Sequence, residues 1–230
     1  MLTLFHHPLS SASRFIRLVL EEYEEAANLH EENVFERRPV FLELNPACTL
    51  PVLQDGASGP ICGASAIAEY LDETRGPLMR ERRLLPETAI ERAEARRLVD
   101  WSLTKLEDEV THYLVRERAL KRQLPPEQGG GSPDSGVIRA AKTNLKHHMK
   151  YFAWLAVSRN WFAGEKMSYA DLAAASSFSV LDYLGEVSWD EEPGLKDWYA
   201  RIKSRPSFRS LLAERVKGLP PTSHYSDLDF

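Results

Sequence analysis

The sequence predicts an α+β protein in which a small unit of helices and strands precedes an all-helical domain. Two observations support this prediction. In the first third, short apolar runs and amphipathic segments follow one another in the order βαβ and then ββα. From about Pro86 onward, apolar residues recur with helical spacing, and no further strand is expected. The boundary between the two parts is expected within residues 76–85.

The first third supplies every strand of the predicted sheet. The first strand is a short apolar run that ends before Pro8, and the next apolar residues recur at the spacing of a helix face. An Asp55-Gly56 turn between two further apolar runs predicts a hairpin. The expected elements are strands at 2–5, 29–34, 51–54 and 60–62, and helices at 13–22, 41–44 and 64–74.

The remaining two thirds predict helices joined by loops. Ser168 and Asp171 have the spacing of a capping box ahead of an apolar helix. Residues 123–136 are rich in Pro, Gly and Ser, so we expect them to form a mobile loop. The expected helices contain Ala93 to Leu106, 137–158 and the segment up to about Gly185, and two more begin at Pro193 and Pro206. The predicted divisions are residues 1–78, residues 86–216 and an acidic, aromatic tail at 217–230.

The composition is that of a folded protein and argues against several classes of function. The 230 residues are 43% apolar, which is enough for one large core or two modest ones. The net charge is −5 with interleaved charges, which disfavours a nucleic-acid surface. No apolar run reaches the roughly 18 to 20 residues of a membrane span, and no signal-peptide pattern begins the chain, so we expect a cytoplasmic protein. Cys48 and Cys62 are expected to be free thiols, and no metal site is expected.

Four stretches make the chain resemble the cytosolic glutathione transferase family. They are HHPLSSASRFIRLVL at the first helix, LNPACTLPVL before the third strand, ASAIAEYLDE at the third helix and MSYADLAAA in the helical domain. The resemblance covers almost the whole chain and implies the glutathione transferase fold, with a thioredoxin-like N-terminal domain, and a homodimer. It also implies that Pro51 is a cis-proline that presents the backbone of Leu50 to a bound peptide.

The resemblance also locates a candidate catalytic hydroxyl. Ser10-Ser11-Ala12-Ser13 stands where the family places its thiol-activating residue, immediately before the first helix. A hydroxyl that donates to sulfur, together with the positive end of a helix, favours the thiolate of glutathione. Ser10 is the best positional match and Ser13 the next. An ordinary helix cap explains these serines equally well.

The start of the third helix departs from the family pattern. The family usually has an acidic residue, Ser, any residue, Ala and Ile there, and the first two positions hold the γ-glutamyl end of glutathione. Alignment on Ala66-Ile67 puts Gly63 and Ala64 at those positions, so both anchoring groups are missing. Ser65 and backbone amides can compensate in part. We therefore expect weak or absent glutathione binding and no cofactor. The candidate cofactor-binding residues form a degenerate set: Leu50, Pro51, Gly63, Ala64 and Ser65.

A narrower resemblance implies a function outside catalysis. The stretches ENVFERRPVFLELNPACTLPVL, GASAIAEYLDETRG and HYSDLDF look like the glutathione-transferase-like division proteins of alphaproteobacteria, which bind filaments of the tubulin homologue FtsZ. This resemblance implies a non-catalytic, dimeric adaptor at the division site that regulates cell division. One alternative is an active transferase that conjugates glutathione to a small electrophile, with Ser10 stabilising the thiolate. Another is a stress-response regulator that binds a different protein.

Two segments are candidate partner-binding surfaces because they combine aromatic and charged residues. One is the loop after the second strand and the other is the C-terminal tail. An ordinary solvated loop and a tail packed on the helical domain are the alternatives. The candidate partner-binding residues are Phe35, Arg37 and Arg38 in the loop, and Tyr225, Asp227, Leu228 and Phe230 in the tail.

Overall fold

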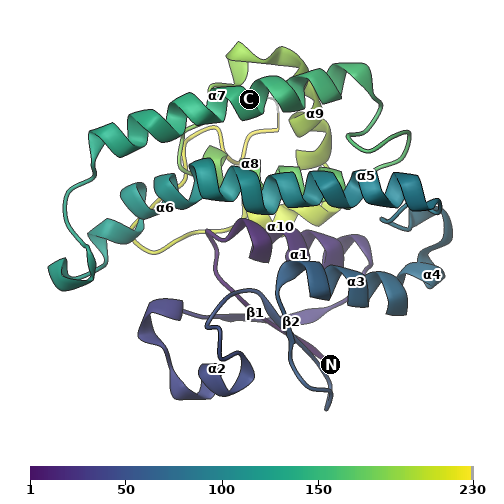
Figure 1. Ribbon diagram of the computed structural model, residues 1–230, viewed down its shortest axis with the longest axis horizontal. Helices are drawn as coiled ribbons and strands as arrows, with labels where there is room; N and C mark the ends of the chain where they lie inside the picture. Colours follow the sequence, from purple (N-terminus) through teal and green to yellow (C-terminus); the bar gives the residue numbers. More distant parts are fainter. Residues whose placement is uncertain (229–230) are drawn as a thin grey trace.

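The computed structural model describes residues 1–228 and contains a four-stranded sheet beneath a layer of long helices (Figure 1). The strand order is β2-β1-β3-β4. Strand β1 runs parallel to β2 and antiparallel to β3, and β4 is antiparallel to β3. This topology confirms the predicted βαβ-ββα order. The strands are β1 (Leu2–His6), β2 (Ala27–Glu31), β3 (Val52–Asp55) and β4 (Ile61–Cys62).

Three helices accompany the sheet. Helices α1 (Ser11–Glu22) and α3 (Ala64–Thr74) lie between the sheet and the long helices, whereas α2 (Pro39–Leu44) lies at the far end of the sheet unit (Figure 1). The apolar stripe of α1 is buried because it packs against both the sheet and the helical domain. The second strand ends three residues before Val34, so its predicted span of 29–34 is wrong; Val34 belongs to a 3₁₀ turn, η1 (Val34–Glu36).

The rest of the chain is helical, as predicted. Helix α5, two π-helical segments and α6 form one continuous rod, which runs beside α7 and above the sheet unit (Figure 1). The helices are α4 (Gly76–Met79), α5 (Ala89–Asp100), α6 (His112–Arg118), α7 (Ser135–Ser158), α8 (Tyr169–Tyr183), α9 (Pro193–Lys203) and α10 (Arg209–Leu212). The π-helical segments are η3 (Trp101–Lys105) and η4 (Glu107–Thr111), and the 3₁₀ turns are η2 (Arg80–Arg82), η5 (Leu120–Arg122), η6 (Pro126–Gln128), η7 (Trp189–Glu191) and η8 (Pro206–Phe208).

Helix α8 forms the centre of the core, and every one of its residues is buried. The predicted capping box is present: the Ser168 side chain accepts from the first turn, and Asp171 accepts from the Ser168 backbone N–H. The Asp171 carboxylate also accepts the Phe162 backbone N–H at 2.9 Å and the Trp198 indole N–H at 3.1 Å. One buried carboxylate therefore joins the start of α8 to the preceding loop and to α9.

The segment 123–136 is folded into hydrogen-bonded turns, and its expected mobility stays a prediction. The Gly131 N–H donates to the Lys121 carbonyl at 2.9 Å. The Glu117 carboxylate accepts the Asp134 N–H at 2.7 Å, and Asp134 in turn caps α7. A carboxylate from α6 thus fixes the end of the segment.

Two further expectations concern the backbone and the membrane. The Leu50–Pro51 peptide bond is cis, as the family resemblance implied. Within residues 1–228, no helix combines the length and the apolar character needed to cross a bilayer.

Candidate functional site

The expected cofactor residues lie together where β3 and β4 meet the start of α3. The Gly63 N–H donates to the Pro51 carbonyl at 3.0 Å. Gly63 has a φ of 89°, a conformation that favours glycine, although a Cβ there would meet nothing within 4 Å. It is the N-cap of α3, and no side chain caps that helix within the described chain. The geometry therefore favours glycine over a carboxylate at position 63.

The two sides of this candidate site differ in their polar groups. Neither backbone group of Leu50 forms a hydrogen bond within residues 1–228, so both are available to an extended peptide. On the other side, Ala64 and Ser65 are the first two residues of α3, and Ser65 is exposed. The first turn of α3 therefore presents backbone amides but no carboxylate.

The serines before α1 have distinct roles. Ser10 is the N-cap, and its Oγ accepts the Ser13 N–H at 3.2 Å. Ser13 is fully buried, and its Oγ accepts the His7 N–H at 3.3 Å. The burial of Ser13 corrects its place as the second catalytic candidate. Ser10 is half-buried and caps the helix, and its role toward a thiol stays a prediction.

Sequence reasoning missed Glu107, which faces the start of α1. The Ser11 hydroxyl donates to Glu107 Oε2 at 2.9 Å. Burial raises the pKa of Glu107 to about 7, and the neighbouring Asp108 raises the pKa further while the Ser11 hydrogen bond opposes the shift. Glu107 is therefore close to half-ionised at neutral pH, so it can hold or accept a proton beside the positive end of α1.

The loop after β2 has one exposed aromatic side chain and two differently placed arginines. The Phe35 side chain is 45% exposed, and Arg37 is also exposed. Arg38 instead forms an ion pair with the buried carboxylate of Glu32 and lies 3.2 Å from His30. Phe35 and Arg37 are thus accessible, and the Arg38 side chain is also 42% exposed but is held by Glu32.

The tail is anchored by Tyr225, which corrects its place among the partner-binding residues. Tyr225 is fully buried, and its hydroxyl accepts from Arg14 Nη1 and donates to the Leu211 carbonyl, both at 3.0 Å. Asp227 is exposed, and Leu228 is 42% exposed. Phe230 lies outside the described residues. The tail therefore packs on the helical domain through Tyr225 and presents Asp227 and Leu228.

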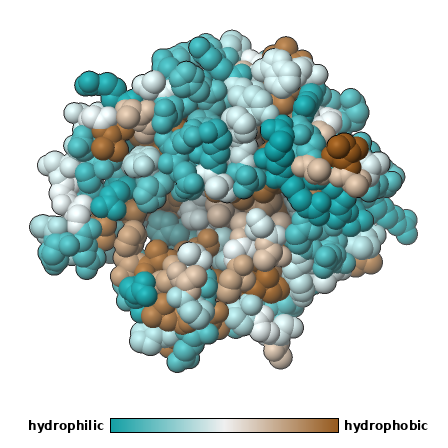
Figure 2. Space-filling model, viewed as in Figure 1, coloured by the Kyte–Doolittle hydropathy of each residue, from teal (hydrophilic) through white to brown (hydrophobic). Residues whose placement is uncertain are grey.

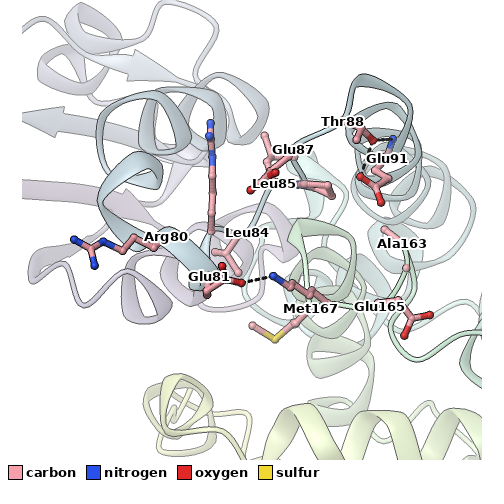
Figure 3. A pocket seen from close by; sticks show the side chains of 14 residues that line it. Arg80, Glu81, Leu84, Leu85, Glu87, Thr88, Glu91, Ala163, Glu165 and Met167 are labelled. Atoms are coloured by element: carbon pink, nitrogen blue, oxygen red, sulfur yellow. Dashed lines mark hydrogen bonds and ion pairs between the residues drawn. The ribbon is translucent and has the colours of Figure 1, made fainter.

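Two of the hollows on the described surface differ in character. Figure 2 shows a hollow between the sheet unit and the helices above it, with apolar side chains gathered on the sheet unit below. A separate pocket of about 300 Å³ lies between residues 80–91, which join the sheet unit to α5 and begin that helix, and residues 163–167 before α8 (Figure 3). Charged groups line it, including the Glu81–Lys166 ion pair. None of its lining residues belongs to α1 or α3, so we do not assign the glutathione chemistry to it.

The chain matches both domain models of one family. The model described as "Glutathione S-transferase, N-terminal domain" matches residues 4–79, and "Glutathione S-transferase, C-terminal domain" matches residues 136–206. The chain therefore belongs to the glutathione S-transferase family.

The similar proteins are described in two ways, either as FtsZ-localized or FzlA proteins or as glutathione S-transferases. FtsZ-localized protein A of Caulobacter vibrioides is 41% identical over 99% of this chain and 98% of its own length. The structure of FzlA from C. crescentus superposes with a TM-score of 0.92 at 40% identity and covers 100% of this chain and 99% of that chain. A crystal structure described as a glutathione S-transferase from Sinorhizobium meliloti 1021 superposes with a TM-score of 0.97 at 58% identity over 100% of both chains.

Proposed function

We propose that this protein is a cytoplasmic, homodimeric adaptor that binds FtsZ filaments at the division site and regulates division without glutathione chemistry. The observation that carries the proposal is the 41% identity, over 99% of the chain, to a protein described as FtsZ-localized. The loss of both anchoring groups at positions 63 and 64 supports the non-catalytic part.

The energetic argument starts from the γ-glutamyl end of glutathione. A hydrogen bond to a charged group contributes about 1.5 to 3 kcal/mol, so one lost contact weakens binding by roughly 10 to 150 fold. Two such contacts are absent at Gly63 and Ala64, and only the backbone amides of α3 remain. We therefore expect glutathione binding without these anchors to be weak or absent.

The accessible partner-binding candidates are Phe35, Arg37 and Arg38 in the loop and Asp227 and Leu228 in the tail. A twofold dimer would present each of these surfaces twice. Modest contacts to a polymer then become strong through effective concentration, and the dimer can bridge neighbouring filaments.

Co-sedimentation with assembled FtsZ tests the adaptor. We expect the protein to pellet with filaments in a saturable manner and to remain in the supernatant without them. Phe35→Ala and Leu228→Ala each change an exposed side chain and should weaken pelleting several-fold, while removal of residues from Ser223 onward should weaken it most. Leu78→Ala is the matched control, because Leu78 is also exposed but lies on α4. Absence of pelleting would remove the adaptor proposal.

The second candidate function is an active glutathione transferase. Glu107, with a pKa of about 7 and a hydrogen bond to Ser11, supports it, and so do the free backbone groups of Leu50. The relative from S. meliloti described as a glutathione S-transferase points the same way. Conjugation of glutathione to an activated aryl halide, lost in Ser10→Ala, would favour this function over the adaptor.

A further inference from the structure

Helix α7 carries a stripe of positive charge that neither function uses. Its 24 residues include four cationic side chains and no Asp or Glu. The spacings of three, four and four residues place all four on one face of the helix. The chain as a whole has a net charge of −5, so this face reverses the overall sign. The four residues are Arg139, Lys142, Lys146 and Lys150.

Three of these cations line a groove beside α6. The groove has a volume of about 460 Å³, and Arg118 from α6 lines its other side. Ile138, which is half-buried, adds an apolar side chain to the lining. We call this site the α6–α7 groove and define it by Arg118, Ile138, Arg139, Lys142 and Lys146.

Acidic residues neutralise the groove only in part. The buried Glu186 carboxylate pairs with Arg118 and, at 3.2 Å, with Lys142, so it holds two cationic groups in place. Lys146 pairs with Glu191 at 3.0 Å in an exposed ion pair that contributes little. Arg139 is exposed and has no acidic partner within residues 1–228. Four cations therefore face two carboxylates, which leaves excess positive charge.

We propose that the α6–α7 groove binds an acidic peptide segment, one that contains several Asp or Glu residues and a small apolar side chain. Fixed guanidinium and ammonium groups match carboxylates, and Ile138 offers an apolar contact. Helix α7 does project two large apolar side chains, Trp154 and Val157, but both lie beyond the groove, toward the C-terminal end of the helix. Within the groove the cations flank only the half-buried Ile138, which suits a peptide side chain better than the broad apolar face of a membrane-surface helix. The site is separate from the loop at Phe35 and from the tail, and it does not depend on which partner they bind.

Fluorescence anisotropy of a labelled synthetic peptide rich in Asp and Glu with interspersed Leu tests this proposal. The full-length protein should bind it, and the affinity should fall as salt is raised. The counterpart peptide with Asn and Gln should bind at least roughly tenfold more weakly. Arg139→Glu/Lys146→Glu should weaken binding of the acidic peptide by roughly tenfold or more, because two attractive contacts become repulsive.

The matched control is Arg80→Glu/Lys217→Glu, which makes the same change in net charge at two exposed positions outside the groove. This control should bind the acidic peptide nearly as well as the unmodified protein, and thermal melts should show both variants folded. Equal loss in the two variants would mean that net charge alone acts and would overturn the proposal. Equal binding of the amide peptide would overturn it too, as would groove-dependent binding of anionic vesicles without peptide binding.

Discussion

The side chains of Ser11 and Glu107 meet although 96 positions separate them, with Ser11 Oγ donating to Glu107 Oε2 at 2.9 Å. Ser11 begins α1, and Glu107 begins the second π-helical segment of the long rod. This contact joins the sheet unit to the helical domain. It also brings a carboxyl group with a pKa of about 7 to the helix end where the resemblance implies thiol chemistry.

The raised pKa of Glu107 predicts a stability that falls as pH rises. Below the ordinary pKa of 4.5, folded and unfolded states both hold the proton, and the group adds no pH dependence. Between pH 4.5 and about 7 the unfolded state loses the proton first, so the folded state is penalised, at most by about 3 kcal/mol. Urea denaturation should therefore show Glu107→Gln gaining stability over the unmodified protein from pH 5 to pH 8. A difference that stays constant over this range would contradict the buried, shifted carboxyl.

Ala64→Ser restores one anchoring hydroxyl at the first residue of α3. Because such a hydrogen bond to a charged group contributes about 1.5 kcal/mol or more, glutathione should bind roughly tenfold more tightly. Isothermal titration calorimetry measures the change. Thr74→Ala is the control and should have little effect, since it removes an exposed hydroxyl at the opposite end of α3. Tight binding by the unmodified protein, unaffected by Ala64→Ser, would refute the degenerate-site interpretation.

Tyr225 should contribute to the free energy of unfolding as well as hold the tail in place. Tyr225→Phe removes the hydroxyl that Arg14 and Leu211 share, which should cost about 1 to 3 kcal/mol because the buried guanidinium loses a partner. Tyr225→Ala should cost about 3 to 5 kcal/mol and make the tail sensitive to limited proteolysis. Urea denaturation gives the free energies of unfolding. Leu228→Ala should remain within about 0.5 kcal/mol of the unmodified protein, and an equal loss there would argue against a specific anchor.

The buried carboxylate of Asp171 should stabilise the helical domain strongly, because it accepts hydrogen bonds from three separate segments. Asp171→Ala leaves the N–H groups of Ser168, Phe162 and Trp198 without their buried acceptor, so we expect a loss of at least about 3 kcal/mol. Ser168→Ala removes only the cap and should cost about 1 kcal/mol. Similar losses in the two variants, measured by thermal unfolding, would show that the carboxylate acts only as part of the cap.

Local patterns predicted most of the fold. The helix at 64–74 and the capping box at Ser168 depend on nearby residues, so periodicity and spacing located them. Strand β2 begins and ends earlier in the chain than the predicted span of 29–34. Its ends are set by parallel pairing with β1, which runs from Leu2 opposite Ala27 to His6 opposite Glu31. The apolar side chain of Val34 makes the sequence predict a longer strand. Strand β1 ends at His6, however, so it has no residue that could pair with Val34.

Sequence alone predicts the parts of the candidate site that follow from alignment with the family pattern. It does not predict the parts that depend on contacts between residues far apart in the chain. Gly63 and Ala64 could be placed by alignment, and the structure puts Gly63 against Pro51. Glu107 could not be found, because π-helical turns shift the face that ordinary helical spacing predicts and its partner is distant in sequence. For Tyr225 the sequence leaves partner binding and packing of the tail both open, because its partner, the buried Arg14, lies at the other end of the chain.

The measurement that tests the central claim most directly combines FtsZ co-sedimentation with glutathione conjugation on one preparation of the full chain. The adaptor account predicts saturable pelleting with assembled FtsZ and no conjugation of an activated aryl halide. A protein that stays in the supernatant and turns over glutathione, with activity lost in Ser10→Ala, would contradict the account.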